Sequence, residues 1–268
     1  MSVTTFEWKG AGLAVTGTHE TFAAASAELP EGAYTTFRTY QGRRIVRLTQ
    51  HVRRLNESAG LRGTPGDLKH ADVKAAVTAA LDAARHDESR FRLTFAPPRL
   101  LVGVEPFRPP PARAYEEGVW CVTVPVRREN PRAKDTRFIA TATAAYAGLP
   151  SGIEEGLMVA ADGVVLEGLS SNFFAVRRSR LWTEEERVLQ GVTRALAMEV
   201  AATVLPVERN GVPLDSSVAE CFITSVSREV MPVVQVDGRP VGDGRPGPFT
   251  REIASRFAAL VEREAQTF

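Results

Sequence analysis

The distribution of apolar positions predicts strands and an amphipathic helix early in the chain. Two β-rich runs, 32–40 and 43–48, meet at Gln41-Gly42, a pair typical of a hairpin turn. A helix is predicted to follow, with Thr49 as its N-cap, because apolar residues then recur at helical spacing until glycines break the pattern. These recurring residues are Val52, Leu55 and Ala59.

The alternation of strands and helices continues to the end of the chain. A second amphipathic helix is predicted from about Asp67 or His70 to Arg85. Further strands are predicted at 91–95, 100–104, 119–126, 157–161, 164–166, 172–176, 220–226 and 230–236. Further helices are predicted at 136–146, at 192–204 and in a final segment that contains Ile253, Phe257, Leu260 and Val261. Because hairpins dominate the strands and helices interrupt them, we predict an α+β fold.

A proline-rich stretch, Pro106 to Ala114, divides this pattern in two. Proline supplies no amide donor and restricts the residue before it, so the stretch is predicted to be neither helix nor central strand. We therefore expect a small N-terminal α+β domain at 1–106, an interdomain connector at 107–114 and a larger C-terminal cofactor-binding domain at 115–268.

The composition is that of an ordinary globular protein and argues against several functional classes. The net charge of +1, with arginines interleaved among acids, predicts no nucleic-acid partner. The sequence shows neither an export signal nor an apolar run long enough to span a bilayer, so we expect no membrane partner. Cys121 and Cys221 lie far apart in apolar runs and are predicted to be buried free thiols, which fits a reduced, cytoplasmic compartment.

Several common catalytic motifs are absent. The four histidines show no HExxH spacing and pair with no cysteine cluster, so no metal site is predicted. The absence of Gly-x-Ser-x-Gly, GxGxxG and GxxxxGK[ST] argues against a serine hydrolase, a dinucleotide binder and a P-loop NTPase. Chemistry that needs an amine has few candidates, because only four of the 33 basic residues are lysines: Lys9, Lys69, Lys74 and Lys134.

Three groups of segments carry a family resemblance. The first is residues 51–59, His-Val-Arg-Arg-Leu-Asn-Glu-Ser-Ala. The second comprises 155–158, 162–174 (Asp-Gly-Val-Val-Leu-Glu-Gly-Leu-Ser-Ser-Asn-Phe-Phe) and 189–194, and the third comprises 220–225, 232–233 and 242–248. In this order and spacing they resemble the class IV aminotransferase family, which holds branched-chain and D-amino-acid aminotransferases, (R)-selective amine transaminases and aminodeoxychorismate lyase. The resemblance implies an enzyme that uses pyridoxal 5'-phosphate (PLP).

The resemblance also implies a fold and a catalytic lysine. The fold is PLP fold type IV, with two α/β domains, mainly antiparallel or mixed sheets, and the cofactor at the domain interface. Lys134 matches the lysine that bonds to the cofactor and then moves the proton. Lys69 and Lys74 fall on or beside the polar side of the second predicted helix and Lys9 lies near the terminus, so solvated roles suit all three. Glu167 matches the carboxylate that keeps the pyridine nitrogen protonated, which makes the ring a better electron sink.

The phosphate of the cofactor needs amides and a cation. The predicted helix after Gly191 offers unpaired amides and a positive dipole end, so the Val192 backbone and Thr193 are expected to hold the dianion. Arg54 supplies a fork of charged donors. Arg194, by contrast, is expected to form a structural salt bridge.

Other contacts are implied by the resemblance alone. Ser225 and the amide of Val226 form a second contact to the phosphate, and Leu189 packs on the ring face. Tyr34 and Arg38 are implied as substrate-binding residues.

The chain departs from the family pattern at several positions. Thr35 stands where relatives usually have an acid, and Arg137 where they often have Asn. Val226 stands where they often have Thr, so a phosphate contact there would use the backbone alone. The segment 95–99 is shorter than the loop that helps to select substrate in several subfamilies, so the pattern leaves the substrate open.

Three functional hypotheses follow from the resemblance. The first is a homodimeric aminotransferase that exchanges an amino group between an amino acid or amine and a 2-oxo acid. The second is aminodeoxychorismate lyase, which uses the same cofactor and lysine to eliminate pyruvate. The third is a non-catalytic family member, suggested by Thr35, Arg137 and Val226, although the retention of Arg54, Lys134 and Glu167 argues against it.

Overall fold

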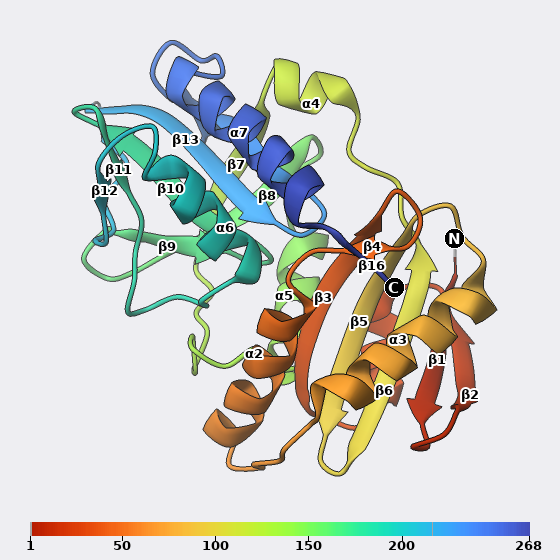
Figure 1. Ribbon diagram of the computed structural model, residues 1–268. Coiled ribbons are helices and arrows are strands. Elements are labelled where there is room, and N and C mark those ends of the chain that lie inside the picture. Colours follow the sequence, from red (N-terminus) through yellow and green to blue (C-terminus); the bar gives the residue numbers. More distant parts are fainter. Residues whose placement is uncertain (1, 216) are drawn as a thin grey trace. The chain divides into compact units, whose positions relative to one another are not determined.

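The computed structural model describes residues 2–215 and 217–268 of the chain (Figure 1). It divides into two compact units. The first unit comprises Met1–Arg108, Ala133–Ala140 and Glu264–Phe268, and the second comprises Pro109–Arg132 and Thr141–Arg263. Each unit combines a sheet with helices, so the predicted α+β class is confirmed.

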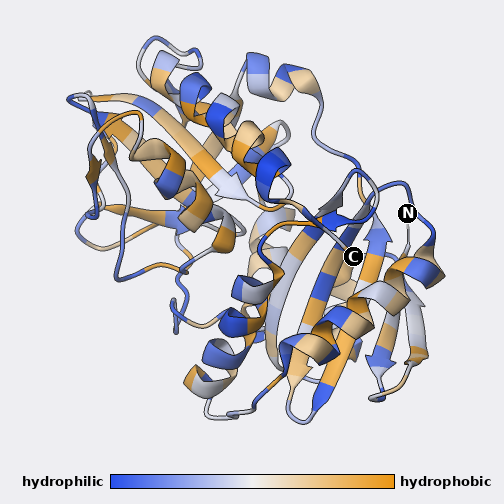
Figure 2. Cartoon of the chain, viewed as in Figure 1, coloured by the Kyte–Doolittle hydropathy of each residue, from blue (hydrophilic) through white to orange (hydrophobic). Residues whose placement is uncertain are grey.

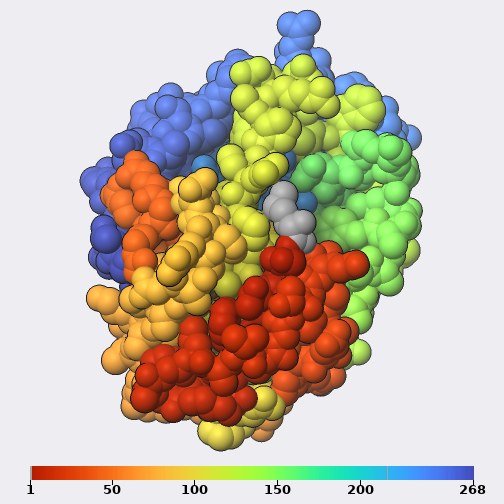
Figure 3. Space-filling view, turned by 90° about the vertical axis from the view of Figure 1, so that its right-hand side faces the viewer, coloured from red at the N-terminus to blue at the C-terminus, as the bar shows by residue number. Residues whose placement is uncertain are grey.

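The first unit is built on a seven-stranded sheet in the order β16-β4-β3-β5-β6-β1-β2, and all of its pairings are antiparallel. Its strands are β1 (Val3–Trp8), β2 (Leu13–His19), β3 (Ala33–Tyr40), β4 (Arg44–Ile45), β5 (Ser89–Ala96), β6 (Arg99–Pro106) and β16 (Gln266–Thr267). Its helices are α1 (Phe22–Glu28), α2 (Leu48–Leu61) and α3 (His70–Ala84). The strand β2 lies at the edge of the sheet, and its exposed side chains belong to the red N-terminal region that Figure 3 shows at the surface.

The core of the first unit lies between the sheet and the helices α2 and α3. Successive side chains of a strand point to opposite faces, so Ala33 and Phe37 of β3 share one face with Thr35 between them. Ala33 and Phe37 join the apolar residues of α2 and α3 in one cluster. Burial of each large apolar side chain contributes about 1.5–3 kcal/mol. Both helices carry alternating hydrophobic and hydrophilic residues in Figure 2, as expected for helices with one buried side.

The predicted hairpin at Gln41-Gly42 is confirmed, since β3 pairs with β4 across it and both turn residues have positive φ angles, 52° and 82°. The predicted N-cap of the following helix is wrong: α2 begins at Leu48, before Thr49, and its N-cap is Arg47. Arg47 adopts the left-handed conformation at the N-cap, so the helix begins two residues earlier than predicted, and its guanidinium forms an ion pair with Glu264 at 2.7 Å.

The second unit is built on a nine-stranded mixed sheet. The strand order is β12-β11-β10-β13-β14-β7-β8-β9, with β15 paired to β14, and the pairs β14–β7, β7–β8 and β11–β12 are parallel. The strands are β7 (Val119–Val124), β8 (Ile153–Val159), β9 (Val165–Gly168), β10 (Asn172–Arg177), β11 (Arg180–Trp182), β12 (Val207–Glu208), β13 (Val218–Ser225), β14 (Glu229–Val236) and β15 (Arg239–Pro240). The helices are α4 (Ala112–Glu116), α6 (Val192–Ala201) and α7 (Pro248–Glu264), of which α6 packs against β13, while α5 (Arg137–Ala147) begins in the first unit and continues into the second.

Backbone pairing assigns two short segments to the first unit that the predicted division placed in the C-terminal domain. Residues 133–140 belong to the first unit because Asp135 forms a β-bridge with Ala33. Residues 264–268 belong to it because β16 pairs with β4.

The expectation of an irregular connector through Ala114 is corrected by α4, which begins at Ala112. The last proline of the stretch, Pro111, is the N-cap of this helix, so no proline lies inside it and its amides can form helical hydrogen bonds.

Both cysteines are buried and free, as predicted. Among the described residues, no helix is both long enough and apolar enough to cross a membrane.

Candidate active site

The first unit brings together three of the predicted site residues, Tyr34, Arg54 and Lys134. Tyr34 lies on β3, and its side chain is on the sheet face opposite Ala33 and Phe37. The amide of Tyr34 donates to the carbonyl oxygen of Lys134 at 2.8 Å, and the amide of Lys134 donates to Ser58 Oγ at 3.1 Å. These bonds fix the backbone of Lys134 beside β3 and α2.

The side chain of Lys134 differs from those of the other three lysines. Its Nζ lies 4.5 Å from the centroid of the Tyr34 ring, and the residue is half-buried. The other lysines are exposed: Lys9 and Lys69 pair with acids close in sequence, and Lys74 lies near the Phe268 ring. The amine predicted to be catalytic is thus the least exposed amine of the chain.

Arg54 is a buried cation held by a hydroxyl group. Its Nη2 donates to Thr35 Oγ1 at 2.6 Å, and Thr35 Oγ1 lies 2.7 Å from His51 Nδ1. Burial lowers the pKa of the Arg54 guanidinium to about 10, so the group is charged at neutral pH. Burial lowers the pKa of His51 well below its usual value, and the nearby charges of Arg54 and Lys134 act in the same direction. Its imidazole is therefore neutral.

The buried Nε of Arg54 has no hydrogen-bond partner. No carboxylate among the described residues lies within ion-pair distance of this guanidinium. A buried cation without a counter-ion is costly, so the arrangement suits an anionic ligand that would pair with it.

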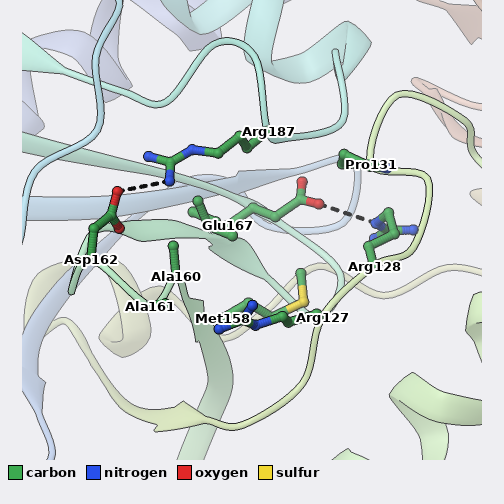
Figure 4. A pocket seen from close by; sticks show the side chains of 10 residues that line it. Arg127, Arg128, Pro131, Met158, Ala160, Ala161, Asp162, Glu167 and Arg187 are labelled. Atoms are coloured by element: carbon green, nitrogen blue, oxygen red, sulfur yellow. Dashed lines mark hydrogen bonds and ion pairs between the residues drawn. The ribbon is translucent and has the colours of Figure 1, made fainter.

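The second unit places Glu167 at the wall of a cavity of about 440 Å³ (Figure 4). Glu167 Oε1 accepts from Arg128 Nε at 3.1 Å, and both side chains are buried. Glu167 Oε2 accepts from Asn172 Nδ2 at 3.2 Å and from the Leu189 amide at 3.1 Å. In Figure 4 the Glu167 carboxylate and the Arg128 guanidinium point toward each other, while Arg187 turns to Asp162. Both oxygens of the Glu167 carboxylate are thus held by hydrogen bonds.

Val192 and Thr193 are the first two residues of α6, and Leu189 lies three residues before the helix. The Leu189 amide donates to the Glu167 carboxylate. Asn172 Nδ2 also donates to the carbonyl of Leu189 at 2.8 Å, which ties this segment to β10. A Cβ on Gly191 would lie 2.5 Å from Asn172 Oδ1, so only glycine permits this approach. Gly191 provides no side-chain cap, and the first-turn amides of α6 therefore offer donors of the kind that bind phosphate.

Ser225 and Val226 lie in the second unit, at and beyond the end of β13. Thr224, the residue before them, pairs in register with Asn172, and Asn172 pairs with Glu167 on β9. Ser225 Oγ accepts from the Arg228 amide at 3.2 Å. The residues predicted from β9, from the end of β13 and from the start of α6 therefore share one region of this unit.

Two further residues with predicted roles, Arg38 and Arg194, contact other side chains of the protein. Arg38 stacks on the rings of Tyr40 and Phe107, with its guanidinium carbon 3.8 and 4.7 Å from the two centroids. Arg194 forms the predicted structural ion pair, with Glu185 at 2.7 Å.

Sequence reasoning assigned no role to His51, Asn172 or Arg128, although each contacts a predicted site residue. The spacing of His51 and Arg54, three residues apart on one helix, was an available signal, since such residues are neighbours on a helix surface. Arg128 lies in a loop, where no periodicity indicates its direction.

Comparison with known proteins identifies the family of the chain. The amino-transferase class IV family profile matches residues 32–236. D-alanine aminotransferase of Bacillus licheniformis is 25% identical over 258 residues, which cover 88% of this chain and 90% of that protein. Branched-chain-amino-acid aminotransferase-like protein 2 of Arabidopsis thaliana is 25% identical over 84% of this chain, but this chain spans only 44% of its length.

A solved structure shares the fold along nearly the whole chain. The branched-chain aminotransferase of Thermoproteus uzoniensis superposes with a TM-score of 0.79 at 23% identity and covers 98% of this chain and 96% of its own. The family profile covers more than half of the sequence and includes the Arg54, Lys134 and Glu167 positions. The chain belongs to the class IV aminotransferase family.

Proposed function

We propose that this protein is a PLP-dependent aminotransferase that moves an amino group between an amino acid or amine and a 2-oxo acid. The observation that carries the proposal is Lys134, the one half-buried lysine, with its backbone fixed to β3 and its Nζ beside the Tyr34 ring. Family membership supports it, as do the D-alanine and branched-chain aminotransferases among its relatives.

The residues present fit the cofactor. The buried Arg54 guanidinium, with its orphaned Nε, would pair with the phosphate dianion. In the second unit, the amides of Val192 and Thr193 at the start of α6, with Ser225 and the Val226 backbone, are neutral donors of the kind that bind a phosphate. Leu189 offers an apolar surface for the ring.

The chain would contribute two actions to the reaction. When bound, PLP supplies a carbonyl that bonds to an amine and a ring that withdraws electrons from the substrate carbon. The Glu167 carboxylate, held by Arg128, Asn172 and the Leu189 amide, would favour a proton on the pyridine nitrogen. Lys134 Nζ would carry the proton to and from the reacting carbon.

Tyr34 and Arg38 are proposed to face the substrate. They lie on the same side of β3, because alternate residues of a strand share a face. Arg38 would pair with a substrate carboxylate.

We also propose an oligomeric state and a cellular compartment for this protein. We expect a homodimer, as the family resemblance implies, and a cytoplasmic protein, since both cysteines are buried free thiols. Sedimentation at several protein concentrations tests the dimer.

A donor and acceptor screen that follows the visible absorbance of the PLP-loaded protein tests the function. We expect an amino donor to bleach the absorbance and a 2-oxo acid to restore it. Release of pyruvate from aminodeoxychorismate without an acceptor would instead indicate the lyase, and tight PLP binding without turnover of any donor a non-catalytic protein. A protein that stays colourless after PLP addition would overturn the proposal.

A further inference from the structure

The contacts of Arg54 contrast with those of other buried arginines. Arg128, Arg194 and Arg228 each pair with a carboxylate at 2.6–3.1 Å. Arg92 has no such partner, but it donates to a carbonyl and to a hydroxyl group. Arg54 makes one hydrogen bond within the described chain, to Thr35 Oγ1, although its side chain is buried.

We propose that Thr35 and His51 are a positioning pair that holds Arg54 in place without neutralising it, so that its full charge is available to an anionic phosphate ligand. This inference rests on the proposed function, because the ligand is taken to be the phosphate of PLP. It assigns Thr35 and His51 a role in binding although neither touches the ligand.

The hydrogen-bond directions support the pairing. A guanidinium only donates, so Thr35 Oγ1 accepts from Arg54, which leaves the hydroxyl proton of Thr35 able to donate to His51 Nδ1. The neutral imidazole can accept this proton at Nδ1 and carry its own hydrogen on Nε2. Three side chains are thus joined in a chain of two bonds that begins at a cation and ends at a neutral ring.

The rigidity of the pair makes its effect specific. Thr35 is fully buried in β3 between Ala33 and Phe37, and the His51 ring packs against Phe37 with centroids 5.3 Å apart. Both side chains are buried where they contact each other beside Arg54. A carboxylate, which relatives usually have at position 35, would also hold the guanidinium, but it would pair with part of the charge that Thr35 leaves to the ligand.

The experiment measures dissociation constants of the full-length protein for PLP, and for inorganic phosphate in competition with it. Thr35→Val removes the hydroxyl at nearly constant size, Thr35→Asp adds a carboxylate, and Thr35→Ser restores the hydroxyl. Thr36→Val is the matched control, because Thr36 is the next residue of the strand and its side chain is on the opposite face.

We expect Thr35→Val to weaken both affinities about tenfold and Thr35→Asp to weaken them further, because the bond to a charged group is lost in one variant and the charge is cancelled in the other. Thr35→Ser and Thr36→Val should stay within about threefold of the wild type. Because Thr35 acts before chemistry, the loss should appear in PLP affinity, with turnover at saturating PLP nearly unchanged.

A second pair of variants keeps the test decisive if Thr35→Val does not fold. His51→Leu removes the acceptor of the Thr35 hydroxyl and should weaken PLP binding, whereas His51→Asn offers an amide oxygen and should retain it. The inference is overturned if Thr35→Val and Thr35→Asp bind PLP and phosphate as the wild type does, or if His51→Leu and His51→Asn behave alike. Failure of the wild type to bind PLP would instead overturn the proposed function.

Discussion

Each unit holds a buried charged side chain of the predicted site, Glu167 or Arg54, and the two are held in opposite ways. In the second unit Glu167 is satisfied on both oxygens, by Arg128 on one side and by Asn172 and the Leu189 amide on the other. In the first unit Arg54 is buried with one hydroxyl partner and an orphaned Nε. A satisfied charge stabilises the protein alone, whereas an unsatisfied one gains most when a ligand arrives. The difference teaches that the carboxylate of the second unit is fixed by the protein alone, whereas the guanidinium of the first unit keeps a donor without a partner.

The largest effect is expected from Lys134→Ala, which removes the proposed covalent anchor and proton carrier. Turnover should fall at least about 1,000-fold, because both nucleophilic and acid–base catalysis are lost. Steady-state rates with the preferred donor measure it. Lys74→Ala, which alters an exposed lysine, is the control and should retain wild-type rates. Retention of more than a tenth of the activity in Lys134→Ala would contradict the assignment.

The next effect is on the stability of the second unit. Glu167→Gln leaves the buried Arg128 guanidinium without its counter-ion, so the free energy of unfolding should fall by about 3 kcal/mol. Urea unfolding of the PLP-free protein measures this change. A loss below about 1 kcal/mol would mean that the buried Arg128 guanidinium does not need the Glu167 carboxylate as a counter-ion.

The corresponding variant of the first unit should change the free energy of unfolding in the opposite direction. Arg54→Met removes a buried cation that has no counter-ion, so the PLP-free protein should be equally stable or more stable by about 1 kcal/mol. Its affinity for PLP should fall about 100-fold, because several charge-assisted hydrogen bonds to the phosphate are lost. The same urea titration, run with and without PLP, measures both changes. Destabilisation of the PLP-free protein comparable to that of Glu167→Gln would remove the contrast between the units.

The smallest effect concerns pH and His51. Its pKa is well below the ordinary 6.5 in the folded state, so the unfolded chain takes up a proton first as the pH falls. The stability due to neutral His51 is therefore present above pH 6.5 and declines below it, by about 1 kcal/mol per pH unit. Unfolding free energies at pH 7.5, 6.5 and 5.5 should decline more steeply in the wild type than in His51→Asn, which shares all other titrating groups, including Arg54 and Lys134. Parallel declines would show that His51 is charged in the folded protein.

The sequence predicted the elements with strong periodicity better than the pairing between them. The hairpin at Gln41-Gly42 and the buried positions Val52, Leu55 and Ala59 could be read from local patterns. The short strand β16 could not, because it is paired to β4 across most of the chain and carries little pattern of its own.

The site was predictable where a motif carried it and not where partners met through packing. The motif residues Glu167 and Asn172 form the contacts of a rigid carboxylate. The bond from Arg54 to Thr35 depends on the register of β3 and on the rotation of α2, which no single segment encodes. Thr35 therefore looked like a defect in the family pattern, whereas the structure gives it a partner.

The most direct test of the account identifies the lysine that bonds to PLP. The protein is incubated with PLP, reduced with borohydride so that the bond becomes permanent, digested and analysed by mass spectrometry. The account predicts one modified peptide, with the added mass on Lys134. Modification of Lys9, Lys69 or Lys74 in its place, or no modified peptide at all, would contradict it.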